Sequence, residues 1–298
     1  RVLCCCQETN RTVFRGRATC TIWCRSKLMD GNRPLEFYGQ SLGQTVHWQT
    51  ILNKEYCPFL QKKCVKVRKS DPEQSIGACI LGYGSGALIV CPHRLLQHDR
   101  VFLDMIPLIQ RQQEYYIIPE VAMPGGTIDY FLVAMDGVTI ADYIGLETQS
   151  LDTTASGAIW EARNDLLRGR YNQYYKYGIN WKMSAKTILV QMHHKANVFE
   201  GLGRKLVLVI QREFFEYVTK VFRTRHLHEA SENDSIHFHI YDCVVLNNQF
   251  NISLVQRRST DVRGIEEMLN LREATTISES EVIEKIRAKL PMARRLSA

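Results

Sequence analysis

The chain has 298 residues, of which 45% are hydrophobic and 23% are charged, and its formal net charge is +7. No residue class is skewed enough for a disordered chain, a collagen-like repeat or a coiled coil. No run of about 18 apolar residues occurs, so the sequence predicts no membrane span. The ten cysteines are too sparse for a disulfide scaffold but sufficient for a metal site.

Residues 1–28 differ in composition from the rest of the chain. They contain six basic residues against one acid, and five of the ten cysteines. We expect Met29 to be the native start and the preceding residues to be a leader that is disordered or not native. Without them 32 basic residues (38 less six) face 30 acids (31 less one), a charge of +2.

The remaining chain alternates between helix-like and strand-like segments. Residues 57–91 are rich in Gly and Lys and have little regular pattern. The expected elements that follow are helices at 93–113, Trp160–Leu167, Ala185–His194, Glu266–Leu271 and Glu279–Leu290, an apolar-periodic segment at Phe214–Phe222, and strands at Thr127–Ala134, Val138–Gln149, Lys205–Ile210 and Ser235–Val245. A turn at Asp136-Gly137 is expected to join the first two strands as a hairpin. This mixed order predicts an α/β or α+β domain.

Acidic residues gather on the expected hairpin. Glu147 and Gln149 are two apart on one strand, so their side chains leave the same face, and Asp129 begins the neighbouring strand. The Gly125-Gly126 pair just before it allows another backbone to approach closely. Carboxylate and amide oxygens suit Mg²⁺, which can activate water toward a phosphodiester. From spacing alone, an ordinary hairpin with both acids in solvent remains open.

Four cysteines lie within 35 residues: Cys57, Cys64, Cys79 and Cys91. Four thiolates favour a tetrahedral iron or zinc site, although none of these cysteines forms a CxxC pair. Proline follows Cys57 and Cys91 and stiffens the chain at both positions. Four unrelated thiols remain the alternative on spacing alone.

Basic residues surround the acidic hairpin in the sequence. One group follows it: Arg163, Arg168, Arg170, Lys182, Lys186, Lys195, Arg204 and Lys205. A second group lies between the cysteines: Lys62, Lys63, Lys66, Arg68 and Lys69. For any one of them a solvated surface position is the simpler interpretation, but as a group they indicate contacts with DNA phosphates. His237 and His239 are expected on the exposed face of a half-buried strand.

The two patterns together resemble those of the NotI family of type II restriction endonucleases, within the PD-(D/E)XK nuclease superfamily. The hairpin is similar to the superfamily signature in its variant with glutamine in place of the usual lysine: Asp129, strand, turn, strand and Glu147-Thr148-Gln149, with Glu120 before it and Leu151-Asp152 after it. The cysteine motifs of the family are matched by Cys57-Pro58-Phe59, Cys64-Val65-Lys66, Gly77-Ala78-Cys79 and Val90-Cys91-Pro92.

The resemblance implies an α/β fold with a PD-(D/E)XK core, a central mixed β-sheet flanked by helices, over residues 93–298. A small Cys4 metal-binding segment at 29–92 would precede it. The implied magnesium ligands are Asp129 and Glu147; Gln149 would orient the attacking water, and Glu120 would be an auxiliary acid. The four cysteines would hold a structural iron, with zinc as the alternative.

The resemblance also implies a biological role. It predicts a homodimer in the cytoplasm of a prokaryote that cleaves double-stranded DNA with Mg²⁺ at a specific, palindromic and GC-rich site. Arg163, Arg168, Arg170, Lys182, Lys186, Lys66 and Arg68 would contact the DNA. A non-catalytic metal-knuckle DNA-binding protein and a structure-selective repair nuclease of the same superfamily are the alternatives.

Overall fold

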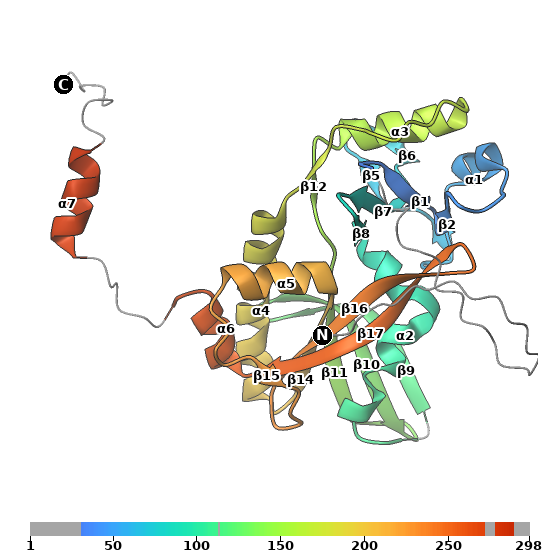
Figure 1. The fold of residues 1–298 in the computed structure, drawn as a ribbon. Coiled ribbons are helices and arrows are strands. Elements are labelled where there is room, and N and C mark those ends of the chain that lie inside the picture. Colours follow the sequence, from blue (N-terminus) through green and yellow to red (C-terminus); the bar gives the residue numbers. More distant parts are fainter. Residues whose placement is uncertain (1–30, 113, 272–277, 289–298) are drawn as a thin grey trace, which may run out of the picture.

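The computed structural model describes residues 31–112, 114–271 and 278–288, and it is an α/β protein built on a mixed seven-stranded sheet (Figure 1). The strand order across the sheet is β15-β17-β16-β14-β11-β10-β9. These strands are β9 (Glu114–Met123), β10 (Gly126–Asp136), β11 (Thr139–Gln149), β14 (Lys205–Gln211), β15 (His228–Glu229), β16 (Ile236–Leu246) and β17 (Gln249–Thr260). Within the described ranges, no helix is long and apolar enough to cross a membrane.

The centre of the sheet is parallel and its sides are antiparallel. β9, β10 and β11 form an antiparallel meander, whereas β11, β14 and β16 run parallel to one another. Helices supply the crossovers that parallel strands need. They are α3 (Gly157–Leu167) and α4 (Trp181–Gly201) between β11 and β14, and α5 (Arg212–Val221) between β14 and β16. β14 is a continuous apolar run because both of its faces are buried.

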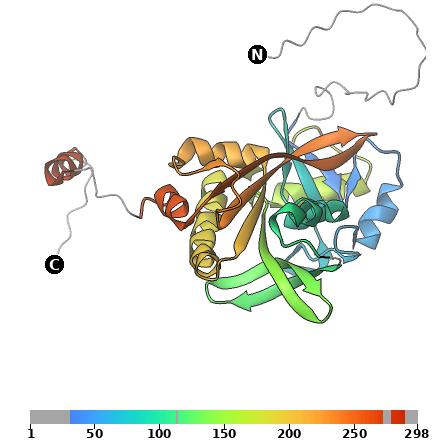
Figure 2. The same cartoon turned by 90° about the horizontal axis from the view of Figure 1, so that it is seen from below.

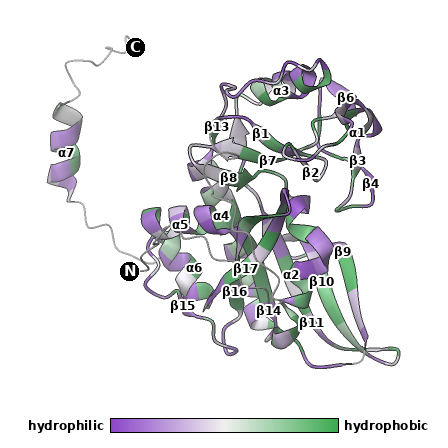
Figure 3. Cartoon of the chain, turned by 45° about the vertical axis from the view of Figure 1, so that its right-hand side comes forward, coloured by the Kyte–Doolittle hydropathy of each residue, from purple (hydrophilic) through white to green (hydrophobic). Residues whose placement is uncertain are grey.

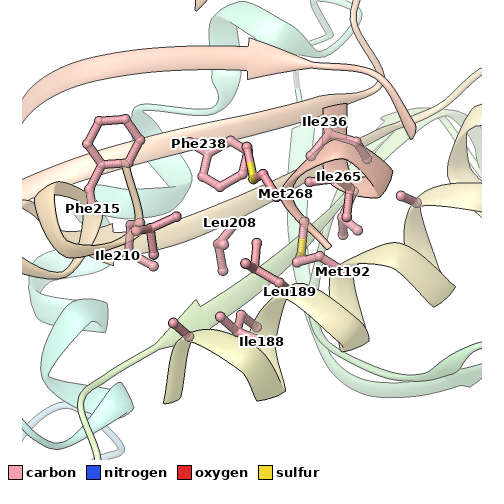
Figure 4. Close-up of a cluster of buried hydrophobic side chains, with 14 of the residues drawn as sticks. Ile188, Leu189, Met192, Leu208, Ile210, Phe215, Ile236, Phe238, Ile265 and Met268 are labelled. Carbon is pink, nitrogen blue, oxygen red and sulfur yellow. The ribbon is translucent and has the colours of Figure 1, made fainter. Parts of the chain in front are cut away.

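Helices cover both faces of the sheet (Figure 2). On one face α4, α5 and α6 (Val262–Met268) pack onto β14 and β16 (Figure 4). α4 presents apolar residues at helical spacing to this core: Ala185, Ile188, Leu189, Met192, Ala196 and Phe199. The other face is covered by three short helices: η1 (Pro92–Asp99), α2 (Arg100–Leu103) and η2 (Ile106–Leu108).

A smaller four-stranded sheet, of order β2-β1-β7-β8, lies near the carboxyl ends of β11 and β14. The short elements of this region are β1 (Pro34–Phe37), β2 (Gln40–Ser41), α1 (Trp48–Lys54), β3 (Tyr56–Cys57), β4 (Lys62–Lys63), β5 (Val67–Arg68), β6 (Asp71–Ser75), β7 (Ala78–Tyr83) and β8 (Gly86–Ile89). The Gln211 side chain joins the two sheets, since its oxygen accepts from the Ile89 N–H and its Nε2 donates to the Ala87 carbonyl.

The core under the small sheet combines two distant parts of the sequence. Side chains from residues 37–90 pack with side chains from residues 159–177. The expected division at residue 92 therefore does not coincide with the limits of this hydrophobic cluster. A pair of two-residue strands, β12 (Thr153–Thr154) and β13 (Gly178–Ile179), flanks the α3 excursion.

Most of the expected elements are confirmed, including the hairpin at Asp136-Gly137. The expected helix at 93–113 is wrong, because His98 and Asp99 adopt left-handed φ of 53° and break the chain into η1, α2 and η2. β9 and β17 were not expected. The last helix is α7 (Glu279–Arg287). Residues 1–28 and 289–290 lie outside the described residues.

The prediction that His237 and His239 form an exposed stripe is also wrong. Both side chains are fully buried. The reason is the position of β16 between β14 and β17, where both of its faces are covered. The alternation of histidine and apolar residues therefore belongs to a strand that is buried on both faces.

Candidate functional site

Asp129 and Glu147 come together where β10 and β11 diverge. Tyr130 is the first residue of β10 that pairs with β11, opposite Leu146, so Asp129 stands at the fork. Its Oδ2 accepts from the N–H of Thr148 at 2.8 Å and from the Thr148 hydroxyl at 2.9 Å. These two bonds fix the direction of the carboxylate and leave its Oδ1 without a bond from Thr148.

Glu147 is almost fully buried, with 3% of its surface exposed. Its Oε1 accepts from Nζ of Lys195 on α4 at 2.6 Å. Burial and the nearby Asp129 charge raise the pKa of Glu147 to about 7, against the lowering effect of Lys195 and of the Asp129 N–H. Burial makes the charged form of Glu147 unfavourable, and a cation bound beside the carboxylate would stabilise that form.

A close approach between α4 and the start of β10 makes this contact possible. Gly125 has a left-handed φ of 90°, and a Cβ on it would lie 2.9 Å from the His194 carbonyl oxygen and 3.3 Å from the Lys195 nitrogen. The next residue, Gly126, would place a Cβ 3.4 Å from Lys195 Cε. The expected close backbone approach at this glycine pair is confirmed, and the approaching element is α4.

Gln149, two residues after Glu147, ends β11 and lines a cavity of about 330 Å³. The walls come from both parts of the fold: Val65, Lys66, Val90, Cys91, Pro92 and His93 on one side, and Thr148, Gln149, Ser150 and Asp152 on the other. The Gln149 amide donates to the Ser150 carbonyl, so its side-chain oxygen is the group that could face a metal or water. Asp152 accepts from the Ser184 hydroxyl at 3.1 Å.

Glu120 is also brought to this region. In the β9–β10 ladder Val121 pairs with Ile128 and Pro119 with Tyr130, which leaves Glu120 opposite Asp129. Glu120 is exposed and has a left-handed φ of 54°, a local break in an otherwise extended strand. It therefore stands next to the acidic pair on the solvent side.

The four cysteines come from two hairpins. Cys57 ends β3 and Cys64 directly follows β4, whereas Cys79 lies at the start of β7 and Cys91 shortly after β8. Cys64 is partly buried and the other three are buried. The charge of Cys91 acts on each of the other three thiols, so the four share one location.

Backbone N–H groups face these sulfurs. Two N–H groups lower the pKa of Cys57, those of Leu60 and Phe59, although burial raises it overall. A hydrogen bond from Cys79, the charges of Lys66 and His93 and the His93 N–H lower the pKa of Cys91 to about 6 against the effect of burial. N–H groups directed at sulfur are what a bound thiolate needs.

Within the described part of the chain, no group of three or more His, Cys, Asp or Glu side chains is arranged to hold a metal ion. For the acids this is expected of a site with only two carboxylates. For the cysteines it means that the four thiols share one region without forming such a group.

The predicted DNA contacts fall into two groups. Arg163 is buried, with its Nη2 donating to the Glu55 carboxylate and to the Leu52 carbonyl, so it supports α1 and α3 and is not at the surface. This burial corrects its assignment as a DNA contact. The remaining residues are exposed or partly exposed: Lys66, Arg68, Arg168, Arg170, Lys182 and Lys186. Arg68 stacks over the Trp160 ring at 4.4 Å.

Two site residues were not singled out from the sequence. Lys195 was counted only among the basic residues near the hairpin, yet it is buried at the acidic pair. Its signal was its place on the apolar face of α4, three residues after Met192 and four before Phe199. Thr148 is the middle residue of the Glu147-Thr148-Gln149 motif, and no role was predicted for it. In the structure it orients Asp129.

No protein-family model matches the chain, and no curated protein matches it significantly.

Proposed function

We propose that the protein is a type II restriction endonuclease with a PD-(D/E)XK core, which hydrolyses both strands of a specific DNA site. The observation that carries the proposal is the pairing of Asp129 and Glu147 at the fork of β10 and β11. Their carboxylates stand near the carboxyl ends of parallel strands, where α/β sheets commonly bind ligands. Gln149 and Thr148, the residue that binds Asp129, line the neighbouring cavity.

The residues of the fork fit Mg²⁺. Asp129 and Glu147 would hold it, since one or two carboxylates with water and phosphate oxygens are the usual magnesium ligands. The ion would neutralise phosphate charge and lower the pKa of a bound water. Thr148 holds Asp129 in place, and Gln149 offers an oxygen to orient the attacking water.

Hydrolysis at this site balances without a covalent enzyme intermediate. The water oxygen forms a bond to phosphorus and the P–O3′ bond breaks. The leaving O3′ takes up a proton, and the water proton passes to solvent. A homodimer would place one such centre at each strand of a palindromic site.

The four cysteines fit a structural iron or zinc. Their donor set is all thiol, and backbone N–H groups face the sulfurs. The metal would join the β3–β4 hairpin to the β7–β8 hairpin. Since Cys91, Pro92 and His93 line the cavity, it would also hold one wall of the DNA site. Lys66 and the exposed basic residues nearby are suited to phosphate contacts.

The test is cleavage of long DNA with Mg²⁺. Wild-type protein is expected to give discrete fragments, whereas Asp129→Asn and Glu147→Gln lose cleavage by about 10³-fold or more. Asp136→Asn, at the exposed far end of β10, is the matched control and is expected to cleave normally.

Binding measured with Ca²⁺ separates the alternatives. The Asp129 and Glu147 variants are expected to keep shifting DNA in a gel. Wild-type protein that shifts DNA but leaves it uncut with Mg²⁺ would favour a non-catalytic binding protein, and cutting confined to branched or mismatched DNA would favour a repair nuclease. Full cleavage by either acid variant would overturn the site.

A further inference from the structure

The buried lysine at the fork has a role that the acids and Gln149 do not explain. Lys195 is 4% exposed, and its ammonium group contacts Glu147 rather than solvent. A buried ion pair of this kind seldom adds net stability, because removing both charges from water costs about as much as their attraction returns. Stability alone therefore does not account for placing a lysine here.

The proposed reaction would gain from a second positive charge beside the metal. Two carboxylates repel a phosphodiester anion, and the negative charge grows as the water oxygen attacks. Gln149 is neutral and cannot offset this charge. Lys195 is the basic side chain that contacts the acidic pair, and the structure brings it there from a different element.

We propose that Lys195 is the cation of this site and supplies from α4 the positive charge that position 149 lacks. This inference rests on the proposed nuclease function. Before a metal binds, Lys195 neutralises Glu147 and holds its carboxylate at the fork. If Glu147 held a metal, the ammonium group of Lys195 would be freed toward the phosphate, where its positive charge would stabilise the developing negative charge.

The fold limits where the ammonium group can go. The side chain passes over Gly126, and the backbone of α4 at His194 and Lys195 is pressed against Gly125. The backbone of Lys195 is thus packed closely against β10, and its ammonium group lies at the end of a four-carbon side chain. The same carboxylate receives either the ammonium group or a metal, so the two compete for Glu147.

Lys195→Met keeps the length of the side chain and removes its charge. Because Lys195 and a metal compete for Glu147, the variant is expected to bind metal more tightly but to cleave DNA more slowly. In the absence of DNA, the variant is expected to bind Mn²⁺ at least about tenfold more tightly than wild type, because a like charge is gone. Its single-turnover cleavage is expected to fall by about 100-fold or more. Lys220→Met, an exposed lysine on α5, is expected to change neither.

Mn²⁺ binding and cleavage by the variant each test the proposed role of Lys195. Unchanged or weaker Mn²⁺ binding, measured by calorimetry, would make Lys195 merely structural, and cleavage within about threefold of wild type would remove it from the reaction. If Lys195→Met does not fold, Lys195→Gln, which can still hydrogen bond to Glu147, carries the same two expectations. If wild-type protein cuts no DNA, the proposed function fails, but the Mn²⁺ comparison still tests the competition at Glu147.

Discussion

His239 shows how one side chain can set the acid sensitivity of the fold. It is fully buried on β16, and neither ring nitrogen has a hydrogen-bond partner among the described groups. Burial and the nearby charge of Arg257 lower the pKa of His239 to about 3. The pKa of His237 is lowered as well, mainly by burial. At neutral pH the His239 ring is therefore uncharged in the folded protein.

Because folding lowers the pKa of His239, acid destabilises the folded protein. Between pH 6.5 and 3 the unfolded chain binds a proton at His239 that the folded chain does not, so stability falls as the pH falls, by up to about 1.4 kcal/mol per pH unit. His239→Leu is expected to reduce this loss in urea unfolding series at pH 7.5 and 5. The exposed His226→Leu is the control. Equal pH dependence in wild type and His239→Leu would contradict the expectation.

At the scale of elements, the docking of α4 on the start of β10 links packing to the site. The added methyl of Gly125→Ala would meet the backbone of α4, which cannot move aside without carrying Lys195 with it. We expect about 1–3 kcal/mol of destabilisation and a marked loss of cleavage. Gly137, like Gly125, has a left-handed φ, but a Cβ on it would have no atom within 4 Å, so Gly137→Ala is the control. It is expected to lose stability through backbone strain alone and to keep the cleavage rate in the folded protein.

Long periodic elements were predictable from the sequence, and so was the acidic hairpin. α4 and β14 follow their apolar patterns, and the Asp136-Gly137 turn has the residues that its geometry needs. The helix expected at 93–113 failed because left-handed residues inside it leave no mark in hydrophobic spacing. The Lys195 contact could not be predicted, since it depends on how closely α4 packs against Gly125.

At the scale of the whole molecule, a metal held by the four cysteines would join two hairpins that are separate along the chain. The β3–β4 hairpin has strands of only two residues, whereas β7 and β8 belong to the small four-stranded sheet. We expect purified protein to contain one iron or zinc per chain, and Cys79→Ser to lose the metal and melt at a lower temperature. Cys243→Ala changes a buried cysteine on β16 and is expected to keep the metal. Metal-free wild-type protein by elemental analysis would refute the Cys4 site.

The outermost strand of the large sheet is long and partly apolar. Ile117 and Ile118 on β9 are each 41% exposed, and Figure 3 shows hydrophobic residues along this edge. Pro119 follows them and has no N–H to offer, and Glu120 turns the backbone out of the extended range. The same turn that sets Glu120 beside Asp129 thus interrupts the edge. A foreign strand finds only short stretches to pair with there, so the break at Pro119 and Glu120 also protects the protein from growing into fibres through this edge.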